Sequence, residues 1–569
     1  MADEYAAKPR IEIGGNALAP EIELRLERAV VDDDAFLPDM VVLRFRDPDR
    51  DLLEKAGFEI GAIVKVLAAP QGQEASEPMI TAEVTALEAD FDGSGSHAVV
   101  RGYDHSHRLH RGRRTETYRN VTDADIARTV GRRAGLELGQ IDETATVHRH
   151  VSQANASDWE FLAARAREIG QEMAVVDGKL EFRKPAEAGE APEAGDLTSE
   201  DPLQLVVGAD LESFRPRVTS AEQVSEVTVR GWDPDHKEAV VGTARAATVS
   251  ASLSLGPADL ASKFGDPTYV VVDRPLSTQN EVDAAAKAVA EQIASSFAEA
   301  EGVAKGNPKL RAGAAVSVGL AGTPFEGLYT ITSSRHVFDS EGYRTHFVVS
   351  GRHGRSLLAL AASAGANGTA SGRPSTIPGV VTAQVTSVGD SGGQTRVKLS
   401  FPWLSETYES DWVRTVQAGA GKDRGFVVLP EVNDEVLVAF EHGDVRRPYV
   451  LGGLYNGVDV PRLADHFVDQ QTGEVQLRGF MSRKGHSIAF LDGDRDDGIM
   501  LSTGDEGLRI SLDKSQTTIK ITSTGDVSIE GSGDVSIRGR QLKLEADAGV
   551  SIDGGGGNVT VKGTQIQLN

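Results

Sequence analysis

The last stretch of the chain alternates apolar and polar residues in short units. From Gly525 it reads GDVSIEGS, GDVSIRGR, QLKLEADA, GVSIDGGG, GNVTVKG and TQIQLN. Alternation with period two is typical of a strand with one buried face, and a Gly, Asp or Asn ends each unit. Each unit carries one apolar pair, and the pairs recur every 7 to 9 residues. They are Val527/Ile529, Val535/Ile537, Leu542/Leu544, Val550/Ile552, Val559/Val561 and Ile566/Leu568.

The same pattern extends upstream through Ile488/Phe490, Ile510/Leu512 and Ile519/Ile521. A fixed short period with a turn each time predicts stacked strands, as in a β-helix or β-prism. One chain of such strands has a single apolar stripe and nothing of its own to bury it against. Closed rotational symmetry is the usual solution, so we predict a homotrimeric needle over residues 486–569. The ten residues of the pairs from Val527 to Val561 are expected to pack in its core.

Residues 1–357 have a mixed pattern and predict a mainly β base with a few helices. Thr122-Asp-Ala-Asp125 and Ser157-x-x-Glu160 have the form of helix N-terminal caps. A third helix is expected from Val282 to about Phe297, where apolar residues recur at spacings of 3 and 4. Strands are expected at Glu21–Val30, Asp39–Phe45, Ile60–Leu67 and Ile80–Phe91.

Residues 358–379 consist largely of Ala, Ser, Gly, Asn, Thr and Pro, which predicts a linker. Six short strand patterns follow within residues 380–457, which favours a small closed barrel of the OB-fold type. Residues 458–485 would connect this barrel to the needle. The strands are expected at Val380–Val388, Thr395–Phe401, Trp412–Val416, Phe426–Leu429, Glu435–Phe440 and Tyr449–Leu454.

Composition narrows the function classes. The 569 residues include no cysteine, which excludes disulfides and thiolate chemistry. A net charge of −26 argues against electrostatic binding to nucleic acid or anionic lipid. The start shows no signal peptide pattern, and no apolar run approaches 18 residues, so stable membrane insertion is not expected.

One motif suggests catalysis. Gly389-Asp-Ser-Gly-Gly393 matches the surroundings of the nucleophilic serine in chymotrypsin-like proteases. A nucleophilic serine needs a histidine base and an orienting group, and no matching histidine context is present. The five residues lie between two alternating strands, where they are typical of a hairpin turn. We interpret them as a turn.

Three further motifs resemble ligand sites. The histidines 105, 107 and 110 are crowded by arginines, which oppose a dication, so a structural role is favoured. Asp492-Gly-Asp-Arg-Asp-Asp-Gly498 resembles a calcium loop, but its glycine comes one residue late and Thr503 stands where the bidentate glutamate belongs. Gly419-Ala-Gly-Lys422 lacks the first glycine and the Ser/Thr of a phosphate loop. We therefore predict no catalytic, cofactor-binding or metal site.

Several segments together resemble VgrG spike proteins and phage late-control protein D. GYDHSHRLHRGRRTETYRNVTDADIARTV, QANASDWEFLAARAREIGQEM and VRGWDPDHK resemble their base region, and the match continues to Arg352. PEVNDEVLVAFEHGDVRRPYVLGGLYNG resembles the OB-fold of these spikes and of phage baseplate assembly proteins. The resemblance covers nearly the whole chain in the same order.

The resemblance implies the homotrimeric central spike of a contractile injection machine, assembled in the cytoplasm and delivered outward on contraction. The base would join the inner tube and baseplate proteins, and the needle would face the target membrane. The needle is expected to end bluntly, with Ile566, Leu568 and Asn569 docking a PAAR-like tip protein that carries cargo. A spike that degrades cell wall and a receptor-binding tail adhesin are the alternatives. The sequence leaves open which contractile system the spike serves.

Overall fold

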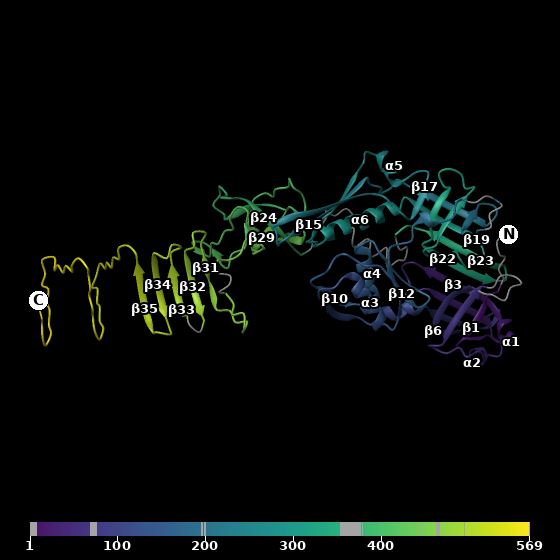
Figure 1. The fold of residues 1–569 in the computed structure, drawn as a ribbon, viewed down its shortest axis with the longest axis horizontal. Helices are drawn as coiled ribbons and strands as arrows, with labels where there is room; N and C mark the ends of the chain where they lie inside the picture. Colours follow the sequence, from purple (N-terminus) through teal and green to yellow (C-terminus); the bar gives the residue numbers. More distant parts are fainter. Residues whose placement is uncertain are drawn as a thin grey trace. The chain divides into compact units, whose positions relative to one another are not determined.

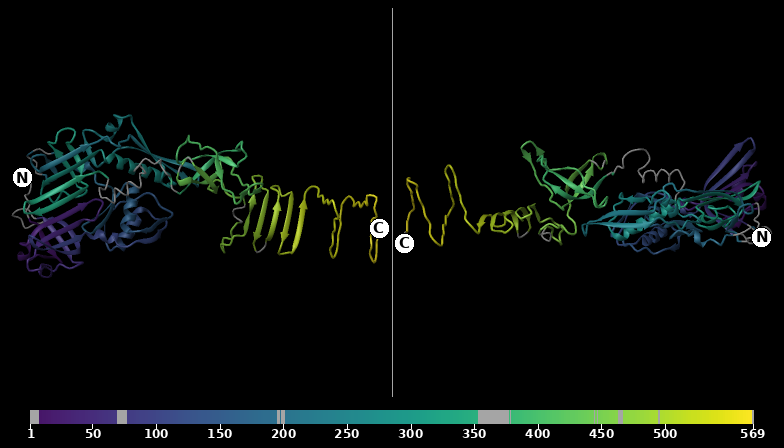
Figure 2. Two further views of the ribbon diagram at one scale, coloured as in Figure 1. Left: turned by 180° about the vertical axis from the view of Figure 1, so that it is seen from behind. Right: turned by 90° about the horizontal axis from the view of Figure 1, so that it is seen from above.

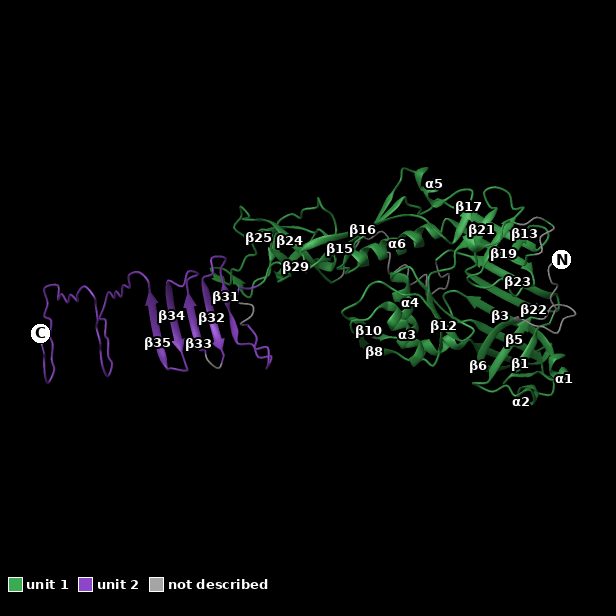
Figure 3. Cartoon of the chain, in the orientation of Figure 1, with its two compact units in different colours: residues 1–460 green, residues 461–569 purple. Residues whose placement is uncertain are grey.

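The computed structural model describes residues 8–68, 77–194, 197, 201–352, 377, 379–443, 445, 447–462, 467–493 and 496–567. The chain is mainly β and forms two compact units, residues 1–460 and 461–569, each described by itself (Figures 1 and 3). Most of the linker predicted at 358–379 lies outside the described residues. Among the helices that are described, none is both long and apolar enough to cross a membrane.

The largest sheet of the first unit joins two distant parts of the chain. Its eleven strands run in the order β14-β19-β23-β22-β3-β4-β7-β6-β5-β1-β2. Antiparallel pairing of β22 with β3, for example Arg335 with Asp32, joins the two halves. The bounds are β1 Arg10–Ile13, β2 Asn16–Ala17, β3 Leu26–Asp34, β4 Met40–Arg46, β5 Ile63–Ala68, β6 Glu77–Asp92, β7 Gly95–Tyr103, β14 Leu211–Val218, β19 Ala298–Lys305, β22 Ser333–Asp339 and β23 Gly342–Val349.

The strand predicted at Glu21–Val30 is wrong in its first half. Pro20 opens a short helix, α1 (Pro20–Glu23), because its fixed φ suits the first helical turn. The strand itself is β3, which begins at Leu26. The strand predicted to start at Ile60 begins at Ile63, after a turn at 60–61.

Residues 105–183 form a smaller α/β part with its own core around Leu162 and Phe182. Both predicted capping boxes are present: Thr122 caps α3 and Ser157 caps α4. The elements are η1 His105–His110, β8 Arg114–Tyr118, α3 Asp123–Arg133, β9 Glu137–Ile141, β10 Val151–Ala156, α4 Asp158–Glu168, β11 Glu172–Val176 and β12 Lys179–Arg183.

The third predicted helix, α6, runs from Gln279 to Ser295 and packs against the hairpin β15–β16. It begins three residues earlier than predicted because Thr278 and Glu281 form a capping box. The remaining elements before residue 352 are α2 Leu52–Ala56, η2 Ala188–Glu190, β13 Gln204–Val206, β15 Glu226–Asp233, β16 Glu238–Arg245, β17 Ala251–Leu253, α5 Pro257–Ser262, β18 Thr268–Val271, β20 Ala315–Gly319 and β21 Gly327–Thr330.

A closed five-stranded barrel follows, in the order β24-β25-β26-β30-β29. Its core gathers Phe401, Trp403 and Phe440 among buried valines. Five of the six predicted strands are present, but Phe426–Leu429 is not a strand in the structure. The bounds are β24 Val380–Val388, β25 Arg396–Ser400, β26 Val413–Thr415, β29 Glu435–Phe440 and β30 Pro448–Gly453, with a small hairpin of β27 Ala420–Gly421 and β28 Arg424–Gly425 and a turn η3 Glu441–Gly443.

The second unit contains an antiparallel meander of five strands (Figure 2). Its first strand begins at Leu477, inside the segment predicted to be a connector. The meander ends at Ser523, and no strand is assigned in the described residues beyond it. The bounds are β31 Leu477–Met481, β32 Ser487–Asp492, β33 Asp497–Ser502, β34 Leu508–Asp513 and β35 Thr518–Ser523.

Candidate functional site

The meander gathers its apolar side chains on one face. Its register places Ile488 opposite Leu501, Leu501 opposite Ile510, and Ile510 opposite Ile521. Residues two apart along a strand point to the same face, so an apolar residue two positions before or after one of these residues lies on this face as well. We call it the apolar face: Phe480, Ile488, Phe490, Ile499, Leu501, Ile510, Leu512, Ile519 and Ile521.

Within one chain the apolar face is the more exposed side of the meander. In β34 the side chains of Leu508, Ile510 and Leu512 are exposed, whereas Arg509 and Ser511 between them are half-buried. A sheet with one solvated face normally shows the opposite arrangement, with polar residues toward water. A contiguous exposed apolar surface of this kind marks an interaction site.

The repeats after Ser523 are also unpartnered within the chain. Within the described part of 525–567, one backbone–backbone hydrogen bond forms, from Gly557 N to Gly554 O. The strands predicted here are therefore absent in the described residues of the single chain, because their backbone groups pair with no other strand of that chain.

The ten residues predicted to pack in the needle core are exposed in the single chain, and their packing in a core formed between copies stays a prediction. Ile529 is 72% exposed, Ile552 69% and Leu544 64%, and each lies on a segment that pairs with no other strand of its own chain. Burial of these side chains would require another copy of the chain. The full set is Val527, Ile529, Val535, Ile537, Leu542, Leu544, Val550, Ile552, Val559 and Val561.

The residues predicted to dock a tip fall at the edge of the described part. Ile566 is 56% exposed, like the pairs before it. Leu568 and Asn569 lie outside the described residues. Their docking role stays a prediction.

One member of the apolar face, Phe480, was not expected from the sequence. Ile499 and Leu501 lie in the strand that the sequence indicates after the acidic segment 492–498, and β33 confirms that strand. The segment 492–498 lies where β32 ends and β33 begins, with Asp492 opposite Asp497, and two of its residues lie outside the described part.

The GDSGG motif is a hairpin turn, as predicted. It connects β24 to β25, with Gly389 and Gly393 at positive φ. Asp390 accepts hydrogen bonds from Gly392 N at 3.0 Å and from Arg396 Nε at 2.6 Å. Ser391 is exposed at the turn. The carboxylate that holds the turn together is thus Asp390.

The three histidines of η1 face different neighbours. His107 Nε2 lies 2.6 Å from Glu83, and His110 stacks on Trp159 with ring centroids 4.7 Å apart. Hydrogen bonding from Arg108, together with His107, lowers the pKa of Glu83 to about 2. Arg108, one of the arginines expected to oppose a dication, therefore pairs with the carboxylate of Glu83.

The Gly419-Ala-Gly-Lys422 segment lies at the hairpin β27–β28.

In the part of the chain that the structure describes, one group of side chains lies close enough to hold a cation. Donor atoms of Asp90, Asp92 and His97 lie within 4.8 Å of one another. Arg44 contacts Asp90 at 2.7 Å and Asp92 at 3.5 Å, so a guanidinium already supplies positive charge between these acids. We interpret the group as an ion-pair network.

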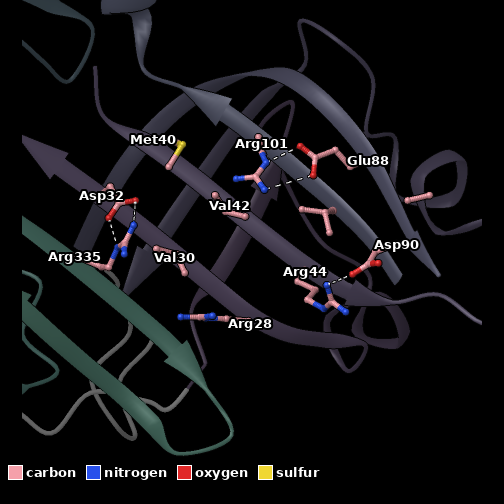
Figure 4. Close-up of a pocket in the computed structure, with 12 residues that line it drawn as sticks. Arg28, Val30, Asp32, Met40, Val42, Arg44, Glu88, Asp90, Arg101 and Arg335 are labelled. Atoms are coloured by element: carbon pink, nitrogen blue, oxygen red, sulfur yellow. Dashed lines mark hydrogen bonds and ion pairs between the residues drawn. The ribbon is translucent and has the colours of Figure 1, made fainter. Parts of the chain in front are cut away.

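The same network borders a groove of about 490 Å³ on the outer face of β3, β4, β6 and β7 (Figure 4). Valines and Met40 form its floor. Arg335 pairs with Asp32, and Arg101 pairs with Glu88, each between neighbouring strands that line the groove. The groove therefore offers paired charges around an apolar floor, which suits contact with a protein surface.

A second group of acids is buried where residues 105–183 meet the large sheet. Asp33 and Asp104 are nearly inaccessible, and Arg311 donates to Asp33 at 3.0 Å. Burial raises the pKa of Asp104 to about 7. Burial, with the charges of Asp33 and Asp104, also raises the pKa of Asp39 well above its ordinary value. Negative charge at this junction is therefore unfavourable.

Two family models match the chain. One, described as the type VI secretion system/phage-baseplate injector OB domain, matches residues 381–455, which form the closed barrel. The other, described as the Alg8 N-terminal domain, matches residues 77–339. The second match spans several sheets and helices of the first unit.

Similar proteins include spike proteins. A 65-residue segment is 42% identical to the type VI secretion system spike protein VgrG1a of Pseudomonas aeruginosa, covering 11% of this chain and 10% of that protein. A 70-residue segment is 37% identical to the actin cross-linking toxin VgrG1 of Vibrio cholerae, covering 12% and 6%. The matched segments thus span about a tenth or less of these relatives.

Solved structures that the comparison matched include a tail protein of Neisseria meningitidis, at 15% identity and a TM-score of 0.44, covering 61% of this chain and 97% of that one. An Escherichia coli component of the type VI secretion system is 16% identical with a TM-score of 0.39, covering 78% and 99%. This chain is VgrG-like, and its residues 381–455 belong to the type VI secretion system/phage-baseplate injector OB domain family.

Proposed function

We propose that the chain is one subunit of a homotrimeric central spike in a contractile injection machine. The observation that carries the proposal is the exposed apolar face of residues 477–523 together with the unpartnered pairs of residues 525–567. Burying one Val, Leu or Ile side chain stabilises an assembly by about 1.5–3 kcal/mol. Copies packed around a common axis would bury all the apolar pairs, and closed rotational symmetry would leave no apolar pair exposed.

The two parts of the needle would assemble differently. The meander pairs its strands within one chain, so each copy would supply one wall of a prism. Residues 525–567 have almost no backbone partner within the chain. Once their apolar side chains are buried, their N–H and C=O groups need partners, which the neighbouring copies would supply. We therefore place the ten core residues from Val527 to Val561 at intertwined contacts between chains.

Function in this proposal is mechanical. The OB barrel family and the curated spike relatives support a structural part of an injector. The base, residues 1–357, would meet inner tube and baseplate proteins, and the groove beside Arg44 and Arg101 is one surface that fits a polar protein partner. At the other end, Ile566, Leu568 and Asn569 would dock a PAAR-like tip with its cargo.

Sedimentation of the full chain tests the proposal. A stable trimer at micromolar concentration is expected. A protein that stays monomeric under these conditions would exclude the needle, because the apolar face would then have no partner copy.

A further inference from the structure

The hairpin β15–β16 has two differently occupied faces. On one face, Val227 and Val229 are fully buried against Val282 and Ala286 of helix α6. Contact is close: a side chain at Gly242 would place its Cβ 2.5 Å from the backbone of Val282. The hairpin is therefore fixed firmly to α6 within the base.

The other face of β15 contacts the OB barrel. Arg230 Nε donates to Pro402 O at 3.2 Å, and Trp232 Nε1 donates to Glu435 Oε1 at 2.7 Å. Glu435 is only 2% exposed, and its second oxygen accepts a hydrogen bond from Asn456 Nδ2 at 2.8 Å. The indole of Trp232 also packs against the barrel core. The buried carboxylate of Glu435 thus accepts one hydrogen bond from the base, donated by Trp232, and one from the segment that follows the last barrel strand, donated by Asn456.

The turn of the hairpin makes a second attachment. Gly457 N donates to Pro234 O at 2.8 Å, and Lys237 forms an ion pair with Asp459. The backbones approach so closely that a Cβ at Gly457 would lie 1.7 Å from Asp235 O. No side chain fits there, so glycine is required at this contact.

We propose that the hairpin β15–β16 is a clamp that fixes the OB barrel on the base, so that the covalent connection through residues 358–379 is not what holds the two together. The contacts form two groups, one along β15 and one at the hairpin turn. Because the barrel is held at both places, it cannot rotate relative to the base about either group of contacts. In the proposed spike, thrust on the base would pass through α6 and the clamp into the barrel and needle. That last step rests on the proposed function; the clamp itself does not.

Cutting the connection tests the clamp. A specific protease site placed between residues 358 and 379 of the full chain allows the purified protein to be cleaved there. The two fragments are expected to remain together in equal amounts on size-exclusion chromatography. Complete separation of the cleaved parent protein would overturn the proposal.

Two substitutions identify the contacts responsible. Trp232→Phe keeps the ring but removes the donor to Glu435, and Gly457→Ala introduces the clash with Asp235. Each should weaken association of the cleaved fragments at least tenfold, measured by fragment release on dilution. The matched controls are Trp412→Phe, on the barrel outside the clamp, and Gly453→Ala, where a Cβ meets no atom within 4 Å. Equal release from variants and controls would also overturn the proposal.

Failure of the clamp and failure of the spike are distinguishable. Sedimentation of the uncleaved chain reports the oligomeric state, whereas fragment stoichiometry after cleavage reports the clamp. If the uncleaved chain is a trimer but the base fragment separates completely after cleavage, the proposed spike stands and the clamp is excluded.

Discussion

Ile510 lies directly opposite Ile521 in neighbouring antiparallel strands, and both side chains are exposed in the single chain. Ile510→Asp would place a charge in the proposed interface between copies. Burying an unpaired carboxylate costs several kcal/mol, and symmetry repeats the cost three times. We expect the variant to sediment as a monomer.

Ser511→Asp is the matched control, because the neighbouring residue points to the opposite face of the meander. It should remain a trimer. Trimers of equal thermal stability for both variants would place the interface elsewhere.

The intertwined part of the needle can be tested at Ile537. Ile537→Asp should prevent residues 525–567 from ordering, whereas Ser536→Asp, on the outward side of the same unit, should be tolerated. Hydrogen–deuterium exchange measures the difference, since amides paired between chains exchange slowly. Rapid exchange of this segment in the parent trimer would contradict pairing between chains.

The buried acids predict a pH dependence of stability. The pKa of Asp104 is about 7 in the folded chain, above its ordinary value of 3.8, so at a pH between these two values the chain takes up a proton when it folds. The contribution of Asp104 to the free energy of unfolding is therefore most favourable at low pH and is lost as the pH rises through 7.

Asp104→Asn should raise stability by about 1–2 kcal/mol at pH 8 and leave it nearly unchanged at pH 4. Calorimetric melting of the base across this range measures the effect, with Asp49→Asn, an exposed acid, as control. A variant that is destabilised at pH 8 would show that the Asp104 carboxylate is needed in its charged form.

The last apolar pair, Ile566/Leu568, predicts where a tip would bind. Deleting residues 566–569 removes this pair and leaves the pairs before it intact. The truncated chain should still form trimers but should no longer retain a PAAR-like tip protein in a pull-down. Retention of the tip in undiminished amount would place its site elsewhere.

Local signals predicted the helices well. Thr122 and Ser157 each cap the helix that follows, because a capping box satisfies backbone donors within four residues. Thr278-x-x-Glu281 is the same signal, and reading it would have placed the start of α6 correctly. Pro20 similarly marked a helix start where a strand was expected.

Strands were predicted less well, because a strand needs a partner that its own residues do not reveal. Phe426–Leu429 has a strand-like composition, yet Val428 bonds through its N–H and C=O to the side chain of Gln417. In the repeats beyond Gly525 the alternation identifies the apolar side chains, whereas the backbone pairs with no strand in the described residues of the single chain. The partners that the prediction gives them are other copies of the chain. The contact between Trp232 and Glu435, 203 positions apart, carried no local signal.

The change at Ser523 from strands paired within the chain to segments without partners has a kinetic consequence. In the proposed trimer, the meander would pair its strands within one chain in a unimolecular step, whereas the repeats beyond it would order only when copies meet. Assembly would then be a concentration-dependent zippering that starts at the meander and ends at the C-terminus. Until assembly is complete, the exposed pairs would be open to non-native association, and repulsion between copies that each carry a net charge of −26 would oppose it.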